Sequence, residues 1–167
     1  GLRNKDALLL QEASTVALPY DHINPIALRE DEISASQHAI DYCAMTQGLQ
    51  HLGGMADMVV VEGSGGWRTL MNDLRPYSEW VVQEQLPVVL VVGIKLGCIS
   101  HGLLTAQAII NDGLPLLGWV ANRINPGLAN YADIITALRK KIPAPQLGEL
   151  PYLPRAEQRD LSGYIDL

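Results

Sequence analysis

The sequence predicts an α/β fold in which the strands of a parallel sheet alternate with helices. Three short apolar segments rich in Val, Leu and Trp, at residues 58–61, 87–92 and 116–121, are typical of strands buried on both faces. Helical patterns lie between them, and this alternation requires crossover connections and therefore a parallel sheet. Fewer strands are visible than such sheets usually contain, so we expect the first half of the fold, a strand–helix–strand portion, to be missing from this chain.

The remaining elements follow from local patterns. A short helix is predicted over residues 6–12, and the proline-containing residues 14–38 predict loop with short irregular pieces. Helical spacing over residues 40–52 ends at Gly53-Gly54, which is typical of a helix C-cap. Further helices are predicted at 78–85, 99–111 and 131–141, with a short final strand at 146–150. No internal repeat or linker is visible, so residues 1–167 predict a single domain.

The composition of the chain argues against a disordered, nucleic-acid-binding or membrane protein. Nearly half of the residues (48%) are hydrophobic, which predicts a globular chain, and the net charge of −6 argues against a nucleic-acid or membrane-surface partner. The two cysteines, Cys43 and Cys98, lie far apart and give neither a zinc pattern nor a disulfide framework. No apolar stretch reaches the roughly 20 residues that span a bilayer. We therefore expect a cytoplasmic protein.

The end of the first predicted strand carries the strongest chemical signal. Glu62 follows the apolar run directly and is succeeded by Gly63, Gly65 and Gly66. An acid at the carboxyl end of a parallel strand lies where such sheets bind ligands, and glycines let backbone N–H groups approach an anion. The pattern predicts a phosphate and Mg²⁺ site with Glu62 as an oxygen ligand. A surface acid before a turn is an equally supported alternative.

The other two strand ends carry weaker signals. A helix that begins near Cys98 would present free N–H groups to a carboxylate or phosphate, although an ordinary loop capped by Ser100 or water is the better local interpretation. Asn122, at the third strand end, could read a purine edge through its paired donor and acceptor, or could be a turn residue. Packing is the better interpretation of Cys98, and a helix-surface role of His101.

A phosphate-binding P-loop, G-x-x-x-x-G-K-[ST], does not occur in the sequence. In proteins that carry this motif it follows the first strand. A chain that begins after it would account for both the missing motif and the missing strands.

Five motifs together resemble the dethiobiotin synthetase family, and the likeness runs over essentially the whole chain. They are the segments Gly1–Leu8, Val61–Trp67, Trp80–Val88, Gly97–His101 and Gly118–Asn122. The sequence looks most like the second, paralogous form of that enzyme found in enteric bacteria. The resemblance implies a P-loop NTPase-like sheet with helices on both faces. It also implies a homodimer that converts 7,8-diaminononanoate, CO2 and MgATP into dethiobiotin, ADP and phosphate in biotin biosynthesis.

The same resemblance implies roles for individual residues. Asp6 and Glu62 would be the Mg²⁺ ligands, and Asn122 would read adenine. The implied nucleotide contacts are Asp6, Glu62, Gly63, Ser64, Gly65, Asn122, Arg123, Pro151, Tyr152, Leu153 and Glu157. The implied contacts with the substrate, across the dimer interface, are Gly97, Cys98, Ile99, Ser100 and Tyr131.

The sequence departs from the family pattern in places that bear on function. Arg123 stands where the better-known form has an acid, and Ser100 stands where Asn is usual. The family's P-loop with its lysine, and the residues that handle the carbamate, would lie before Gly1. The resemblance therefore implies that this chain alone is inactive, and no catalytic residue is assigned within it.

Two other functions remain open at this point. One is another amide- or ureido-forming P-loop ligase, related to the cobyrinate amidases, although no glutamine-hydrolysing domain is visible. The other is a non-catalytic nucleotide-binding or regulatory module like the partition ATPases. Those proteins use a basic surface, which a net charge of −6 does not favour.

Overall fold

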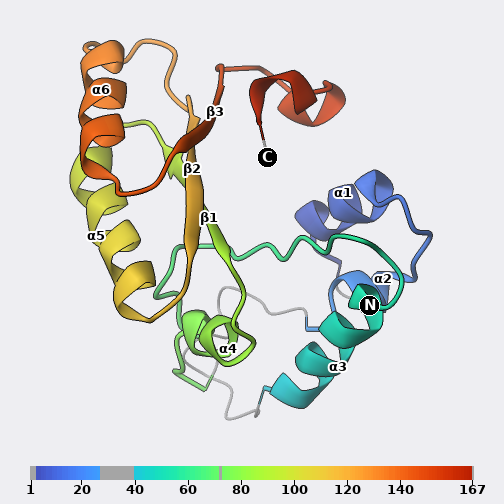
Figure 1. Ribbon diagram of the computed structural model, residues 1–167. Coiled ribbons are helices and arrows are strands. Elements are labelled where there is room, and N and C mark those ends of the chain that lie inside the picture. The colour runs from blue at the N-terminus through green and yellow to red at the C-terminus, as the bar shows by residue number, and fades with distance from the viewer. Residues whose placement is uncertain (1–2, 27–39, 72, 167) are drawn as a thin grey trace. The chain divides into compact units, whose positions relative to one another are not determined.

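The computed structural model describes residues 3–26, 40–71 and 73–166 (Figure 1). The chain divides into two compact units, Gly1–Glu84 and Gln85–Leu167, each of which is described by itself. The expected single domain stays a prediction. No helix among the described residues is both long enough and apolar enough to cross a membrane.

The first unit is helical. Its elements are α1 (Lys5–Ala13), α2 (Tyr20–Ile23), α3 (Tyr42–Gly53) and α4 (Tyr77–Gln83). The Asn4 side chain caps α1 by accepting hydrogen bonds from the N–H groups of Asp6 and Ala7, at 2.7 and 3.3 Å. Asp41 caps α3 in the same way, through the N–H of Ala44 at 2.9 Å. The three helices predicted in this region are confirmed. Of the predicted loop at 14–38, residues 27–39 lie outside the described residues.

The strand predicted over residues 58–61 is wrong. The segment is extended but belongs to no sheet, and Met58 and Val60 are 70% and 73% exposed rather than buried on both faces. A strand exists only where its N–H and C=O groups pair with those of a neighbour. The described part of the first unit contains no other strand that could pair with this segment. Composition alone could not reveal this.

The second unit is built on a parallel sheet of three strands. These are β1 (Val88–Gly93), β2 (Leu116–Asn122) and β3 (Gln146–Leu150), in the order β1-β2-β3. Helix α5 (Cys98–Asn111) connects β1 to β2, and α6 (Tyr131–Lys141) connects β2 to β3 (Figure 1). In the register of the sheet, Val92 lies beside Ala121, which lies beside Glu149. This parallel sheet with its crossover helices confirms the predicted α/β class.

The core of the second unit lies between the sheet and the two helices. Alternate strand residues, among them Val92, Trp119 and Ala121, pack with Cys98 of α5 and Leu138 of α6. Trp119 and Leu138 have no exposed surface. The residues on this face pack α5 and α6 against the sheet. The predicted burial on both faces is wrong for the opposite face, where Val91 and Leu117 are 57% and 52% exposed.

The C-terminal residues are more ordered than the polar tail that the sequence predicts. Two short 3₁₀ helices, η2 (Ala156–Gln158) and η3 (Ser162–Tyr164), follow β3. The chain then forms an antiparallel bridge between Ile165 and Gly148, and the N–H of Asp166 donates to the carbonyl of Leu147 at 2.8 Å. A Cβ at Gly148 would overlap the carbonyl oxygen of Tyr164, so only glycine fits at this position.

Candidate functional site

Asp6, the first predicted metal ligand, lies in the first turn of α1, one residue into the helix, and its side chain is exposed. Carboxylates are favoured in this turn because the unpaired N–H groups there carry partial positive charge. Because the Asn4 side chain already occupies the N–H groups of Asp6 and Ala7, the Asp6 carboxylate is not needed as a cap. It is therefore available for a ligand.

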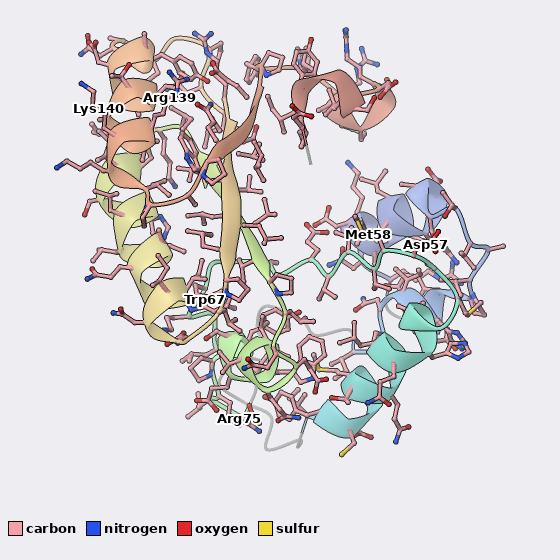
Figure 2. All side chains as sticks on the ribbon, viewed as in Figure 1. Asp57, Met58, Trp67, Arg75, Arg139 and Lys140 are labelled. Atoms are coloured by element: carbon pink, nitrogen blue, oxygen red, sulfur yellow. The ribbon has the colours of Figure 1, made fainter. Side chains whose placement is uncertain are left out.

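Glu62 lies on the extended segment that also carries Met58 (Figure 2), and it is exposed. The glycines that follow form a turn with φ of +81° at Gly65 and +113° at Gly66, values that side-chain-bearing residues rarely adopt. The hydroxyl of Thr69 lies 2.9 Å from the carbonyl oxygen of Ser64 and 2.8 Å from that of Gly66, and its single hydrogen is shared between these two acceptors. The glycine turn is thus shaped by contacts within its own segment.

Thr69 is a residue that the sequence reasoning missed. Its hydroxyl fixes two carbonyls of the turn, and a Cβ added at Gly65 would lie 2.6 Å from it. A hydroxyl residue a few positions beyond a glycine pair is a turn signal that could have identified it. The ring of Tyr77 closes the other side, 3.0 Å from where a Cβ of Gly63 would stand.

The carboxylates of Asp6 and Glu62 are ligands of the chemical type that Mg²⁺ prefers. Mg²⁺ takes oxygen ligands, usually one or two carboxylates, and completes its shell with water and phosphate oxygens. Asp6 and Glu62 offer such oxygens from exposed positions of the first unit. Throughout the described residues, no cluster of three or more His, Cys, Asp or Glu side chains forms a cage of the all-protein type.

The strand ends of the second unit lie together, as the parallel sheet predicts. The N–H of Ile94, after β1, donates to the carbonyl of Asn122 at 2.8 Å, and the N–H of Arg123 donates to that of Leu150 at 3.0 Å. Asn122 therefore stands in the middle of this edge. The predicted base contacts Pro151, Tyr152 and Leu153 follow β3 directly, and Glu157 lies farther on in η2.

Helix α5 begins at Cys98, one residue before the predicted range of 99–111. Gly97 precedes it with φ of +82° and has no side chain that could accept from the first N–H groups of the helix. Cys98 is 2% exposed and packs in the core, which confirms the packing interpretation of this thiol. Ser100 and His101 are exposed. The N–H of Cys98 donates to the carbonyl of Lys95 at 3.1 Å, which closes the turn before the helix.

Arg123 makes contacts that the sequence did not reveal. Its guanidinium carbon lies 4.4 Å from the centroid of the Tyr131 ring, and its Nη2 donates to the carbonyl of Pro126 at 3.1 Å. The hydroxyl of Tyr131 is buried and makes no well-formed hydrogen bond to a described residue. Burial, reinforced by the carboxylate of Glu149, raises the pKa of Tyr131 to about 12. Two residues assigned to different ligands are therefore in direct contact.

Comparisons with known proteins cover nearly the whole chain. Residues 1–159 match a family model described as an AAA domain. The chain is 68% identical, over 168 residues, to the ATP-dependent dethiobiotin synthetase BioD 2 of Escherichia coli (strain K12), an alignment that covers 100% of this chain and 73% of that protein. It is 65% identical to the protein of the same name from Yersinia pestis, over 100% of this chain and 76% of the relative.

A more distant relative gives the same result. The ATP-dependent dethiobiotin synthetase BioD of Vibrio vulnificus (strain YJ016) is 53% identical over 174 residues, which cover 99% of this chain and 75% of the relative. Together with the parallel sheet and its helices, these matches confirm the P-loop NTPase-like fold class and the resemblance found in the motifs. The chain belongs to the ATP-dependent dethiobiotin synthetase family.

Proposed function

We propose that the protein is an ATP-dependent dethiobiotin synthetase of biotin biosynthesis. The observation that carries this proposal is the 68% identity to such an enzyme along 100% of this chain. One amine of 7,8-diaminononanoate takes up CO2 as a carbamate and releases a proton. The γ-phosphoryl group of ATP is transferred to a carbamate oxygen, which leaves ADP. The second amine then attacks the carbamate carbon, phosphate departs, and the ureido ring closes.

We assign the metal and phosphate contacts to the first unit. Asp6 and Glu62 would hold Mg²⁺, which when bound neutralises charge on the phosphates. Gly63, Ser64 and Gly65 would line the nucleotide. The positive φ of Gly65 and the anchoring of the turn by Thr69 support this assignment, because a fixed turn presents its N–H groups without a cost of ordering.

We assign the base contacts to the second unit. The Asn122 side chain would pair with the adenine edge, and Pro151, Tyr152 and Leu153 would flank the ring, with Glu157 near the ribose or the base. Support comes from the edge of the sheet, where hydrogen bonds of 2.8 and 3.0 Å tie the backbone at 122 and 123 to the ends of both neighbouring strands. A base contact at 122 is therefore carried on a rigid element.

We place the substrate carboxylate at the beginning of α5, at residues 97–100, because the first N–H groups of a helix lack intrahelical partners. The N–H of Cys98 already donates to the carbonyl of Lys95 at 3.1 Å, so the N–H groups of Ile99 and Ser100 would do most of the binding. Tyr131 would lie near this substrate, and a second copy of the chain would complete the site in a homodimer. The interior position of Cys98 supports a backbone role for this turn, because the buried thiol cannot itself reach a ligand. A cytoplasmic location fits an enzyme that consumes ATP.

The test is an assay of the protein expressed from its complete gene. With diaminononanoate, bicarbonate and MgATP, we expect dethiobiotin and ADP to form in equal amounts, and neither to form when CO2 is removed. Dethiobiotin is identified by its mass. Binding of MgATP without ring closure would contradict the proposal and favour a non-catalytic nucleotide-binding module. Ring closure on a different diamine would contradict the assignment of the substrate alone.

A further inference from the structure

The contact between Arg123 and Tyr131 joins a predicted nucleotide residue to a predicted substrate residue. Arg123 is the residue after β2, and Tyr131 is the first residue of α6. The short loop between them turns back so that the guanidinium carbon lies 4.4 Å from the ring centroid. At this distance a cation is attracted to the face of an aromatic ring.

The guanidinium has one hydrogen bond to the described part of the chain in addition to its contact with the Tyr131 ring. Its Nη2 donates to the carbonyl of Pro126 at 3.1 Å, inside the same loop. Its Nε is buried and has no hydrogen-bond partner among the described residues. The backbone N–H of Arg123 is fixed in turn by the carbonyl of Leu150 at 3.0 Å. Both the backbone and the side chain of Arg123 are therefore engaged within the second unit.

Tyr131 is fixed by the same arrangement. Asn130, immediately before it, has a positive φ of 60°, an uncommon conformation for a residue with a side chain. The ring of Tyr131 packs against the hydrophobic core of the second unit, and its hydroxyl lies near the carboxylate of Glu149. The guanidinium completes this setting by covering one face of the ring. Removal of the guanidinium would leave the face of the Tyr131 ring that it covers without this contact.

We propose that Arg123 is a positioning residue that fixes the ring of Tyr131, whose hydroxyl is buried, for contact with the diamine substrate, and that it is not a contact for the nucleotide. This inference rests on the proposed function, because it takes the diamine as the ligand near Tyr131. It replaces the role implied for Arg123 by the resemblance. The acid common at this position could not stack on the ring, so Arg123 gives this chain a means of fixing Tyr131 that an acid would not provide.

The test compares Michaelis constants for the two substrates in the protein expressed from its complete gene. Arg123→Ala is expected to raise KM for diaminononanoate about 5-fold or more, as loss of a cation–π contact predicts, and to leave KM for ATP within about 2-fold. Arg123→Lys keeps the charge but loses the planar stack, so it should restore only part of the affinity. A rise in KM for ATP equal to or larger than that for the diamine would overturn the inference.

A double substitution shows whether the effect passes through the ring. Tyr131→Phe keeps the ring, and Arg123→Ala should cost the same in that background as in the unsubstituted protein. Tyr131→Leu removes the ring, and Arg123→Ala should then have no further effect on KM for the diamine. Equal costs in both backgrounds would show that Arg123 acts without Tyr131, which would contradict the proposal.

A matched control separates this role from a general effect of charge. Lys140 also lies on α6, and its side chain points away from the helix into solvent (Figure 2). Lys140→Ala removes the same charge and should leave both Michaelis constants unchanged. If the unsubstituted protein neither closes the ring nor binds the diamine in calorimetry, both the proposed function and this inference are wrong. If it closes the ring and Arg123→Ala changes neither constant, the inference alone is wrong.

Discussion

Two valine-rich segments of this chain resemble each other closely and differ in structure. Residues 58–61 and β1 each contain consecutive valines and each run into a glycine within a few positions. In β1, Val92 is 5% exposed and the strand pairs along its length with β2. In the first segment, Val60 is 73% exposed and no ladder forms. The same composition therefore serves a packed strand in one unit and an extended segment in the other.

The difference shows that strand structure belongs to a pair of segments rather than to one. Burial of valine side chains favours both runs equally, but the backbone groups of a strand also require partners. Residues 88–93 have partners because α5 returns the chain to a parallel neighbour. The first segment has no such partner among the described residues, and its notable feature is that it leads into Glu62 and the glycine turn. We therefore expect substitutions near the first run to change chemistry, and substitutions in the second to change stability.

The largest effect is expected at Glu62. Glu62→Gln keeps the size of the side chain but removes the charge that would hold Mg²⁺, so ATP turnover at limiting Mg²⁺ should fall about 10²-fold or more. Because Glu62 is exposed, the urea unfolding midpoint should not change. The measurement is the Mg²⁺ dependence of ATP turnover in the protein expressed from its complete gene. Unchanged kinetics at limiting Mg²⁺ would refute the metal role.

A matched pair of valine substitutions tests the comparison directly. Val92→Thr places a hydroxyl in the core of the second unit and should cost about 1–3 kcal/mol of unfolding free energy. Val60→Thr, at a position that is 73% exposed, should change it by less than about 0.5 kcal/mol. Urea unfolding measures both. Equal costs would break the comparison and show that Val60 is packed as tightly as Val92.

The smallest effect at neutral pH concerns Tyr77, whose ring lies beside the glycine turn. Burial raises the pKa of Tyr77 from 10.0 to about 12. The folded protein thus favours the neutral phenol, and the stability that Tyr77 adds is complete below pH 10 and is lost as the pH rises toward about 12. Tyr77→Phe should remove this loss, which is absent at neutral pH and grows to about 2 kcal/mol near pH 12. Unfolding curves across this range measure it, and parallel curves for both proteins would contradict the assignment.

Much of the fold could be predicted from the sequence because most elements are marked locally. The helix at 131–141 and the strand at 146–150 have the predicted bounds, and α5 begins at Cys98, one residue before its predicted range. Helix caps and the periodic spacing of apolar residues depend on a few neighbouring residues, so the sequence shows them directly. The strand at 58–61 could not be judged in this way, since its existence depends on a partner distant in the sequence. The order in the C-terminal tail rests on a single bridge and on the space left by Gly148.

The roles of Asp6, Glu62 and Asn122 at the candidate site stay predictions. Glu62 and Asn122 could be singled out by their places after apolar segments, and Asp6 by the resemblance. Thr69 and the stacking of Arg123 on Tyr131 could not, because both depend on how a loop turns back. Side-chain contacts across a loop are set by the conformation of that loop. Sequence spacing does not encode them.

The bridge between Gly148 and Ile165 has a consequence for the behaviour of the protein in solution. The outer strand of a sheet offers unpaired N–H and C=O groups to any other extended chain, which is a common route to aggregation. Here the chain's own end bridges to β3 at Gly148 and occupies the carbonyl group of Leu147. A side chain at residue 148 would displace the tail and uncover that edge. The smallest residue in the strand therefore helps to keep one molecule from adding to the sheet of another.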